Sequence, residues 1–427
     1  MGRSKRGKKA SKGSQEEDWD DNASVLSVAS NESSFTQGQG DQFSTYEENP
    51  LEYITEALYE KRTATRESAL EGLIQYLRSS YRLEECESWK ETLCQRLLGS
   101  LKKGKAKEVQ LASTAVALIV VTLGADAWTE TTVLEFLPLL KQKMTSGASA
   151  GAKVAAIRAL GVLCFVGSED STVLQECIEK VQKLFTASSS DVRSEAYTIL
   201  ALLMSISIPI GNKIVDYMLL YVEHFTKALG DESLEVRTAA GNALVVVNEI
   251  FGDMLDNNDE ENGGGSGGGG GGRNLDEEIV EKMNQLATSS WSNEGVNTRM
   301  NKKDKANQRR AFRDLVDAMD GKSPNSKDSK IKLKHGDVLV LDTQSLKVTA
   351  SVFKSLLAQG FQVHLQNNYL LHQIFNFQPR QEKIHLSQLE KKMMFSPNSA
   401  AKKSATKERN RDRRQRGAAK LDFYECD

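Results

Sequence analysis

Proline, cysteine and aromatic residues are scarce in this chain of 427 residues, which holds 6 Pro, 5 Cys and 7% aromatic residues. Because proline interrupts helices, this composition favours a helical protein, and the 31 glycines include one glycine-rich interruption. The odd and sparse cysteines form no CxxC pair, which is typical of reduced thiols in a cytosolic or nuclear protein. They are Cys86, Cys94, Cys164, Cys177 and Cys426.

Long apolar runs and an excess of one charge are also missing. The longest apolar run, Ala115–Val121, is far shorter than the roughly 20 residues that span a bilayer. The basic N-terminus is followed by polar sequence, unlike a signal peptide, so we expect no membrane partner. Lys plus Arg number 56 and Asp plus Glu 58, and a net charge of −2 excludes a uniformly basic nucleic-acid coat protein.

Composition divides the chain into five parts. Residues 1–50 are rich in Ser, Gly, Gln, Asp and Glu, and we predict a disordered tail because they carry too little apolar surface to fold. The basic cluster Lys5–Lys9 within it fits a nuclear localisation signal, an RNA contact or a solvated terminus. An acidic run and a glycine-rich run predict a flexible linker over 253–274. The other parts are a repeat region (51–252), a C-terminal domain (275–397) and a basic tail helix (398–427).

The repeat region contains five amphipathic segments with one template: a leading residue, Ala four residues later, and Leu or Val after four more. The central alanines follow one another at 43, 44, 40 and 44 residues, and HEAT and armadillo repeats have a period of roughly 40–47. Small central residues let helices approach closely, and stacked repeats bury a core that one repeat lacks. The segments are Thr65/Ala69/Leu73, Glu108/Ala112/Val116, Ala152/Ala156/Leu160, Val192/Ala196/Leu200 and Val236/Ala240/Leu244. The second is the loosest, because its leading residue is charged.

The C-terminal domain reads as mostly helical. Helix patterns cover 275–286, 346–357 and 364–375, and residues 337–342 read as a short strand. The whole pattern predicts an all-α fold: a HEAT/armadillo-like helical-repeat solenoid, a small mostly helical C-terminal unit and a basic C-terminal helix, after a disordered N-terminus.

Catalytic patterns are missing from the sequence. None of the five His forms an HExxH motif or a Cys/His zinc spacing, and no GxSxG elbow occurs. We expect no catalytic, cofactor-binding or metal-binding residues, no small-molecule substrate and no enzyme activity.

Two segments are strongly basic. Residues 299–334 hold 12 Lys/Arg against 5 Asp/Glu, and residues 398–420 hold 9 against 2, so each has a net charge of +7. Each cation that neutralises a phosphate strengthens RNA binding, and arginine also stacks on unpaired bases. These segments predict RNA contacts; a solvated tail and a nuclear localisation signal are the alternatives.

Three C-terminal blocks carry recognisable motifs: His364–Phe375 is similar to the pattern HLQxNxxLRxIF, Arg309–Asp314 has the pattern RxxFRD, and Asn398–Arg414 is a basic ending. Together they resemble the corresponding blocks of the interferon-related developmental regulator family. The piece Lys102–Lys105 resembles a basic stretch of the family before the second repeat.

The resemblance implies a non-enzymatic protein with one of two roles. Family members are associated with translationally inactive ribosomes, where the solenoid lies near the tRNA sites and the C-terminal helix occupies the mRNA channel. The expected partner is then the ribosome, both rRNA and ribosomal proteins, in the cytoplasm. Members were also regarded as transcriptional co-regulators that bind deacetylase-containing complexes, so the alternative is a nuclear scaffold that binds co-repressor proteins through its solenoid. A third reading, a peptide-binding adaptor, is disfavoured because Trp89, Trp128 and Asn242 do not repeat.

The predicted RNA-binding residues lie in both basic segments and in the family block. His364 and Gln366 would stack on or hydrogen-bond RNA, or else pack within the C-terminal unit. For Leu365, Leu370, Leu371, Ile374 and Phe375 we expect packing. The predicted set is Arg309, Arg310, Arg313, His364, Gln366, Lys402, Lys403, Lys407, Arg409, Arg411, Arg413, Arg414 and Arg416.

Overall fold

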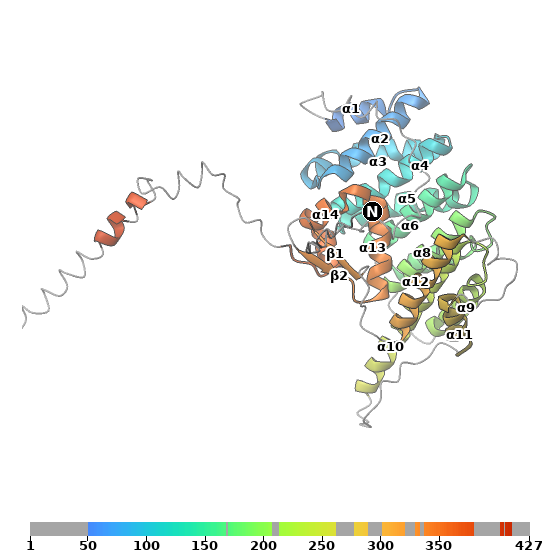
Figure 1. Ribbon diagram of the computed structural model, residues 1–427. Coiled ribbons are helices and arrows are strands. Elements are labelled where there is room, and N and C mark those ends of the chain that lie inside the picture. Colours follow the sequence, from blue (N-terminus) through green and yellow to red (C-terminus); the bar gives the residue numbers. More distant parts are fainter. Residues whose placement is uncertain are drawn as a thin grey trace, which may run out of the picture. The chain divides into compact units, whose positions relative to one another are not determined.

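In a computed structural model, the chain forms two compact units, Met1–Phe377 and Gln378–Asp427 (Figure 1). The structure describes residues 50–167, 170–206, 213–261, 277–288, 301–320, 329–333, 337–379, 402–404 and 406–411, and within these ranges it leaves out the side chains of 127, 128, 131, 213–220, 251–261 and 277. The predicted disordered tail before Pro50 and the glycine-rich run lie outside the described residues.

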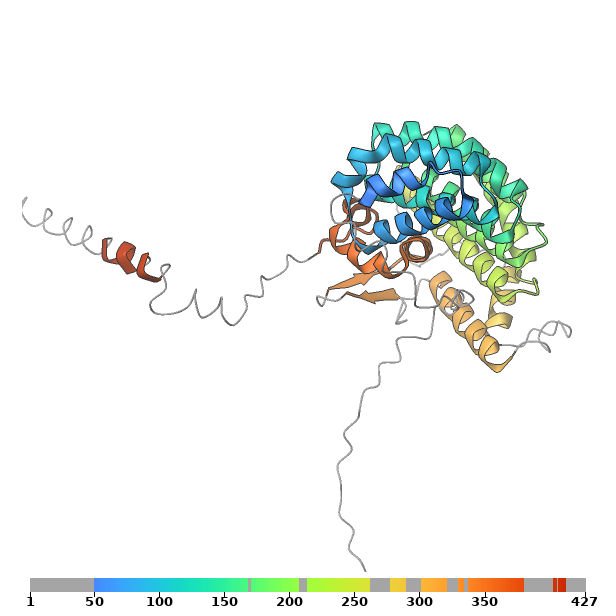
Figure 2. The ribbon, with the colours of Figure 1, turned by 90° about the horizontal axis from the view of Figure 1, so that it is seen from above.

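Twelve helices of the first unit are arranged in six pairs that follow one another along a curved path (Figure 2). The first helices of the pairs are α1 (Pro50–Ala57), α3 (Leu83–Lys103), α5 (Ala127–Ser146), α7 (Ser171–Gln182), α9 (Lys213–Ala228) and α11 (Glu277–Thr288). The second helices are α2 (Thr63–Ser79), α4 (Ala106–Leu123), α6 (Ala150–Gly167), α8 (Ser190–Ile206), α10 (Leu234–Glu261) and α12 (Lys302–Met319). Each second helix packs on its own first helix, and the first five also pack on the second helix of the next pair. This is the predicted HEAT/armadillo-like solenoid.

The five predicted templates all lie on second helices. Their central alanines are at most 1% exposed, and their closing Leu or Val residues are buried as well. Because alanine has a small side chain, the second helices approach closely and share one hydrophobic layer. The predicted repeat period is therefore the sequence separation between successive second helices of this layer.

An arginine near the start of three second helices ties neighbouring repeats together. Arg66, Arg193 and Arg237 each donate from Nη1 to the carbonyls five and six residues upstream, at 2.6–3.3 Å. The rest of each guanidinium reaches into the next repeat: Arg66 pairs with Glu108, and Arg193 with Asp231. A planar guanidinium can make both sets of bonds at once. The charged residue Glu108 fits its template position because its carboxylate accepts hydrogen bonds from Arg66.

The last of these arginines reveals a sixth repeat that the template did not predict. Arg237 donates to Gln308 Oε1 at 2.6 Å, so Gln308 of α12 takes the place that Glu108 has in the second repeat. Four residues later stands Phe312, which is fully buried, where the other repeats have alanine. Gly241 of α10 makes room for it, since a Cβ there would lie 3.1 Å from Phe312 Cε1.

The domain boundary predicted at residue 275 is not a boundary between compact units. Because α12 packs on α10, and residues 343–377 pack on the second helices, the division falls after Phe377. The predicted linker also begins too early, since the backbone of α10 continues through the acidic run to Glu261.

Two core helices are apolar enough to cross a membrane by length and composition, α4 and α6. Most of their residues are buried against neighbouring helices, and among the described residues only these two pass that test. Their apolar character is explained by their place in the middle of the shared layer.

The remaining elements of the first unit follow the sixth pair. Strands β1 (Lys330–Lys332) and β2 (Val338–Val340) form an antiparallel hairpin in which Ile331 lies opposite Leu339. The predicted strand at 337–342 is confirmed as β2; β1 was not predicted. After the hairpin come α13 (Gln344–Leu357), the 3-10 turn η3 (Ala358–Gly360), α14 (Phe361–Asn367) and α15 (Tyr369–Ile374). We call residues 343–377 the inner-face segment.

The helix predicted at 364–375 is in fact two helices. Asn368 has an extended backbone between α14 and α15, and its side chain accepts a hydrogen bond from Leu370 N at 2.9 Å. Asparagine is a favoured N-cap because its side chain satisfies a free backbone N–H of the first turn. The chain therefore turns at Asn368.

Candidate nucleic-acid interface and the covered inner face

The inner-face segment is anchored at its beginning to the fifth repeat. Glu249 of α10 caps α13: its carboxylate accepts hydrogen bonds from the backbone N–H groups of Gln344 and Ser345 and from Ser345 Oγ. Gln344 Nε2 also donates to Asn242 Oδ1 at 2.7 Å. A carboxylate at a helix N-terminus is stabilised both by these donors and by the helix dipole.

The other end of the segment is anchored to the first two repeats. Arg78 Nε donates to Leu356 O at 2.8 Å, His364 Nε2 lies 2.9 Å from Leu77 O, and Asn368 Nδ2 donates to Val121 O at 2.9 Å. All three bonds join the segment to backbone or side chains at the C-terminal ends of α2 and α4. Gly360 lies so close to the carbonyl of Arg78 that any Cβ would overlap with it.

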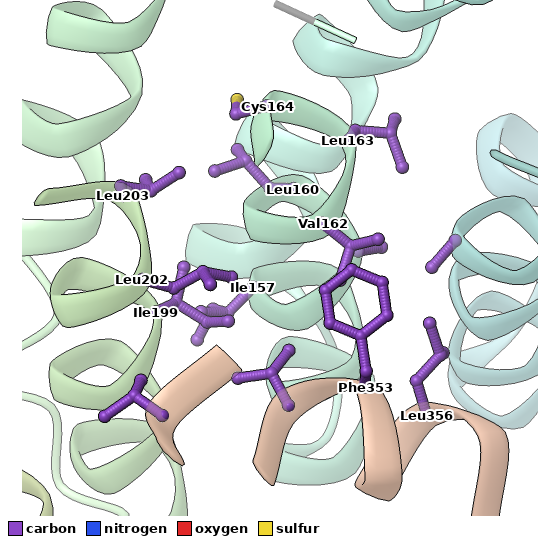
Figure 3. Packing of buried hydrophobic residues seen from close by; sticks show 14 of the residues in the cluster. Ile157, Leu160, Val162, Leu163, Cys164, Ile199, Leu202, Leu203, Phe353 and Leu356 are labelled. Atoms are coloured by element: carbon purple, nitrogen blue, oxygen red, sulfur yellow. The ribbon is translucent and has the colours of Figure 1, made fainter. Parts of the chain in front are cut away.

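Between these anchors, α13 packs on the shared layer of second helices. Figure 3 shows Phe353 of α13 pointing toward Val162 of α6. The ring of Phe353 also meets Phe165 edge to face, with centroids 5.8 Å apart. Val348, Val352 and Leu356 are buried on the same helix. The inner-face segment therefore covers the layer from the first repeat to the fifth.

Of the two roles considered for His364, RNA contact or packing within the C-terminal unit, the structure shows packing. Its side chain is fully buried, its Nε2 contacts Leu77 O, and its ring meets Tyr81 at 6.2 Å. An RNA base has no access to such a ring in the folded unit. Gln366 on the same helix is half-buried, so part of its side chain lies at the surface.

The apolar residues of the same block pack as predicted. Leu365, Leu371 and Phe375 are buried, and Leu370 and Ile374 are partly buried against the core. Phe375 meets Phe353 and Phe361 edge to face. The block thus serves mainly to seat the end of the inner-face segment.

The predicted arginines of α12 lie together on its outer side. Gln308, Phe312 and Leu315 face the solenoid, whereas Arg309, Arg310 and Arg313 are exposed. The helix is well anchored, because Asn301 caps its start and Gln308 joins it to both α10 and α11. A surface depression here is lined by Ala306, Arg309, Arg310, Arg313, Asp314 and Asp317.

The first turns of α12 add to this positive surface. Lys302 and Lys303 are exposed, and the helix as a whole carries six Lys/Arg against three Asp. We call the exposed side chains of Lys302, Lys303, Arg309, Arg310 and Arg313 the α12 basic face. Its chemistry suits phosphate groups, since each guanidinium can donate two parallel hydrogen bonds to one phosphate.

The described part of the second unit is helical at 402–404 and 406–411. Lys402, Lys403, Lys407, Arg409 and Arg411 are all exposed there. Arg413, Arg414 and Arg416 lie outside the described residues. The predicted basic helix is thus present over the part of the tail that the structure describes.

Metal-binding groups give no further site in the described ranges. They hold no cluster of three or more His, Cys, Asp or Glu that could bind a metal ion. The cysteines described by the structure are all buried free thiols.

Comparison with protein families matches most of the chain. The model described as "Interferon-related developmental regulator (IFRD)" matches residues 22–320, and the model "Interferon-related protein conserved region" matches residues 368–417. The chain belongs to the interferon-related developmental regulator family. Its solenoid, including α12, falls in the first match, and α15 and the basic tail as far as residue 417 fall in the second. The residues between the two matches include the hairpin and α13.

Relatives in mammals have similar extents. Interferon-related developmental regulator 1 of Homo sapiens is 26% identical over 392 residues, which cover 86% of this chain and 81% of the relative. Interferon-related developmental regulator 2 of Mus musculus is 27% identical over 389 residues, covering 86% and 82%. The similarity to this family thus extends over both units.

Solved structures with similar folds include designed repeat proteins. A designed armadillo repeat protein in complex with the peptide (KR)4 has a TM-score of 0.38 and 18% identity, and covers 61% of this chain and 98% of its own. An engineered protein of a structural genomics consortium has a TM-score of 0.41 and 16% identity, and covers 62% and 99%.

Proposed function

We propose that this family member is a ribosome-associated, non-enzymatic factor. It binds non-translating ribosomes in the cytoplasm and blocks the mRNA channel and tRNA sites with its basic tail. The observation that carries the proposal is the α12 basic face, a set of exposed cations on a helix that the solenoid holds in place.

The rigid seat of α12 supports a role in RNA binding. Phe312 and Leu315 pack on α10 beside Gly241, and Arg237 holds Gln308. Cations that are already positioned lose less conformational entropy when they meet a phosphate backbone. The α12 basic face therefore suits a folded RNA surface whose phosphates have defined positions.

The basic tail supports the second half of the proposal. Its described residues form a slender helix with exposed Lys402, Lys403, Lys407, Arg409 and Arg411. A single helix with side chains is about 10–12 Å across, which is a suitable width for a passage that takes one RNA strand. Its cations would replace the counterions of the surrounding rRNA phosphates.

The covered inner layer argues against a solenoid that binds extended peptides along its inner side. A peptide there would have to displace α13 and break the hydrogen bonds at Glu249, Arg78 and Asn368. In the part of the first unit that the structure describes, exposed residues of the first helices and of α12 remain available to partners.

The proposal is tested by co-sedimentation with purified ribosomes that carry no mRNA. Changing Arg309, Arg310 and Arg313 to Glu should weaken binding and should lower the slope of log affinity against log salt concentration by about 2. The matched control changes three dispersed exposed lysines, Lys61, Lys103 and Lys227, to Glu, with the same change in net charge. If both triple variants bind as the parent protein does, the α12 basic face has no role in ribosome binding.

The rival function is a nuclear scaffold that binds deacetylase-containing complexes through its solenoid. It predicts nuclear residence, and it predicts partner binding that survives both the α12 changes and removal of the tail. Loss of ribosome binding in the α12 variant, with no loss in the control, would show that the α12 basic face binds ribosomes. The nuclear-scaffold function does not explain such binding.

A further inference from the structure

Two buried cysteines of neighbouring repeats lie in contact. Cys164 is on α6 of the third repeat and Cys177 is on α7 of the fourth, and their Sγ atoms are 3.4 Å apart in a hydrogen bond. They are separated by 13 residues in sequence. Only the fold brings them together.

The surroundings make the two thiols unequal. The hydrogen bond from Cys164 lowers the pKa of the Cys177 thiol and raises that of Cys164. The ammonium group of Lys141, from α5, lowers the pKa of both thiols, and it is paired with Glu176, the residue next to Cys177. A nearby cation favours the thiolate, which is the reactive form of cysteine. Cys177 is thus the nucleophile of the pair, and Cys164 is placed as the second thiol.

Cys177 is fully buried, but the residue before it in the sequence lies at the surface. Lys141 Nζ is 2.9 Å from Glu176 Oε2, and the Glu176 side chain is 58% exposed. In addition, α7 buries only Cys177, Ile178 and Val181. A helix with so few buried residues opens at a lower free energy than the core helices do. A small oxidant can therefore reach the sulfur without unfolding the solenoid.

We propose that Cys164 and Cys177 form a hydroperoxide-sensitive dithiol site that closes into a disulfide between the third and fourth repeats. The Cys177 thiolate attacks one oxygen of hydrogen peroxide, the O–O bond breaks, and the departing hydroxide is protonated to water. The product is a sulfenic acid on Cys177. Cys164 sulfur then attacks Cys177 sulfur, the S–O bond breaks, and the hydroxide leaves as water with the Cys164 proton. Two electrons pass from the two thiols to one peroxide.

The geometry requires a small movement for the second step. The sulfur atoms of a disulfide are about 2.05 Å apart, so the two Sγ atoms need to approach by about 1.3 Å. This step would require rotation of the two side chains and a slight shift of α7. The product would fix α7 to α6.

Two other cysteines serve as internal controls. Cys86 and Cys94 are both buried on α3, and burial raises the pKa of each thiol to about 12. They are eight residues apart on one helix, about 12 Å along its axis, which is too far for a disulfide. Both should stay reduced when the dithiol site is oxidised.

The test treats the full-length protein, with Cys426 changed to Ser, with hydrogen peroxide at neutral pH. The remaining thiols are alkylated after unfolding, and the peptides are mapped by mass spectrometry. We expect a peptide pair linked through Cys164 and Cys177, with Cys86 and Cys94 alkylated. In Cys164→Ser, a dimedone adduct on Cys177 should replace the disulfide.

The parent protein alone decides the question if a variant fails to fold. Loss of the Cys164 and Cys177 thiols while Cys86 and Cys94 persist supports the site. Alkylation of all four thiols to the same extent after peroxide treatment would overturn it, as would a dimedone adduct on Cys86 or Cys94 before Cys177 reacts.

Discussion

Arg66 shows how one side chain can hold two repeats together. Its Nε and Nη2 donate to the two carboxylate oxygens of Glu108 at 2.7 and 2.8 Å. Glu108 is 1% exposed, and this bond raises the pKa of Arg66. Removal of the arginine would leave a buried carboxylate without its cation, which destabilises more than the loss of the pair itself.

Arg66→Met should therefore lower the free energy of unfolding by about 3 kcal/mol. Urea denaturation followed by circular dichroism measures the change. The control is Lys282→Ala, which removes the surface pair with Glu278 and should change stability far less. Equal effects of the two substitutions would show that burial of Glu108 contributes nothing.

His364 predicts a pH dependence for the seating of the inner-face segment. Burial lowers the pKa of His364, and its bond to Leu77 O offsets this only in part. The released segment has the ordinary pKa of about 6.5, so it binds protons more strongly than the seated one. The stabilisation is thus fully present above about pH 6.5 and declines as the pH falls below that value.

Hydrogen exchange of the α14 backbone amides measures this effect. Protection, corrected for intrinsic exchange, should fall between about pH 7 and pH 5 in the parent protein. In His364→Gln the dependence should disappear, whereas the control His372→Gln should retain it. A pH profile that is unchanged in His364→Gln would show that His364 is not the group responsible.

At the scale of elements, η3 is a point where the inner-face segment passes very close to the solenoid. Gly360 occupies a place where a side chain would overlap with the carbonyl of Arg78. Gly360→Ala should therefore lift η3 and α14 off α2, and proteolysis between Leu357 and Asn368 should become faster. The matched control is Gly99→Ala on α3, which meets no atom within 4 Å and should be neutral or slightly stabilising. Equal protease resistance of both variants would contradict the close approach.

The sequence predicted most elements for identifiable reasons. Five second helices were found because a central alanine recurs at the repeat period. The sixth was missed because Phe312 replaces that alanine and the glycine-rich insertion breaks the period. The helix at 346–357 was found within two residues, since its apolar positions recur every three or four residues. The break at Asn368 depends on a local cap that periodicity does not reveal.

At the scale of the whole first unit, the covered inner layer was beyond prediction from the sequence. His364 and Leu77 are 287 residues apart, and Asn368 and Val121 are 247 apart. Each bond ends on a backbone carbonyl, which any residue carries, so the partner leaves no trace in the sequence. Charge, in contrast, is visible in composition. It led to the prediction that Arg309, Arg310 and Arg313 bind RNA, and the structure shows these three side chains exposed on α12.

The two basic regions belong to different units of the molecule. The α12 basic face is fixed on the first unit, and the tail belongs to the second. Two separate contacts with one ribosome would raise the apparent affinity, since the second contact forms at a high effective concentration. Loss of either contact should then weaken ribosome binding by more than the number of removed cations alone would predict.

The most direct test of the account is sedimentation of the tagged full-length protein in a sucrose gradient, at low and at moderate salt. It is compared with a chain that ends at Pro397. The account predicts that the full-length protein travels with single ribosomes and not with polysomes, and that truncation or salt moves it to the top of the gradient. A full-length protein that stays at the top in every condition, or a truncated one that sediments unchanged, would contradict ribosome binding through the basic tail.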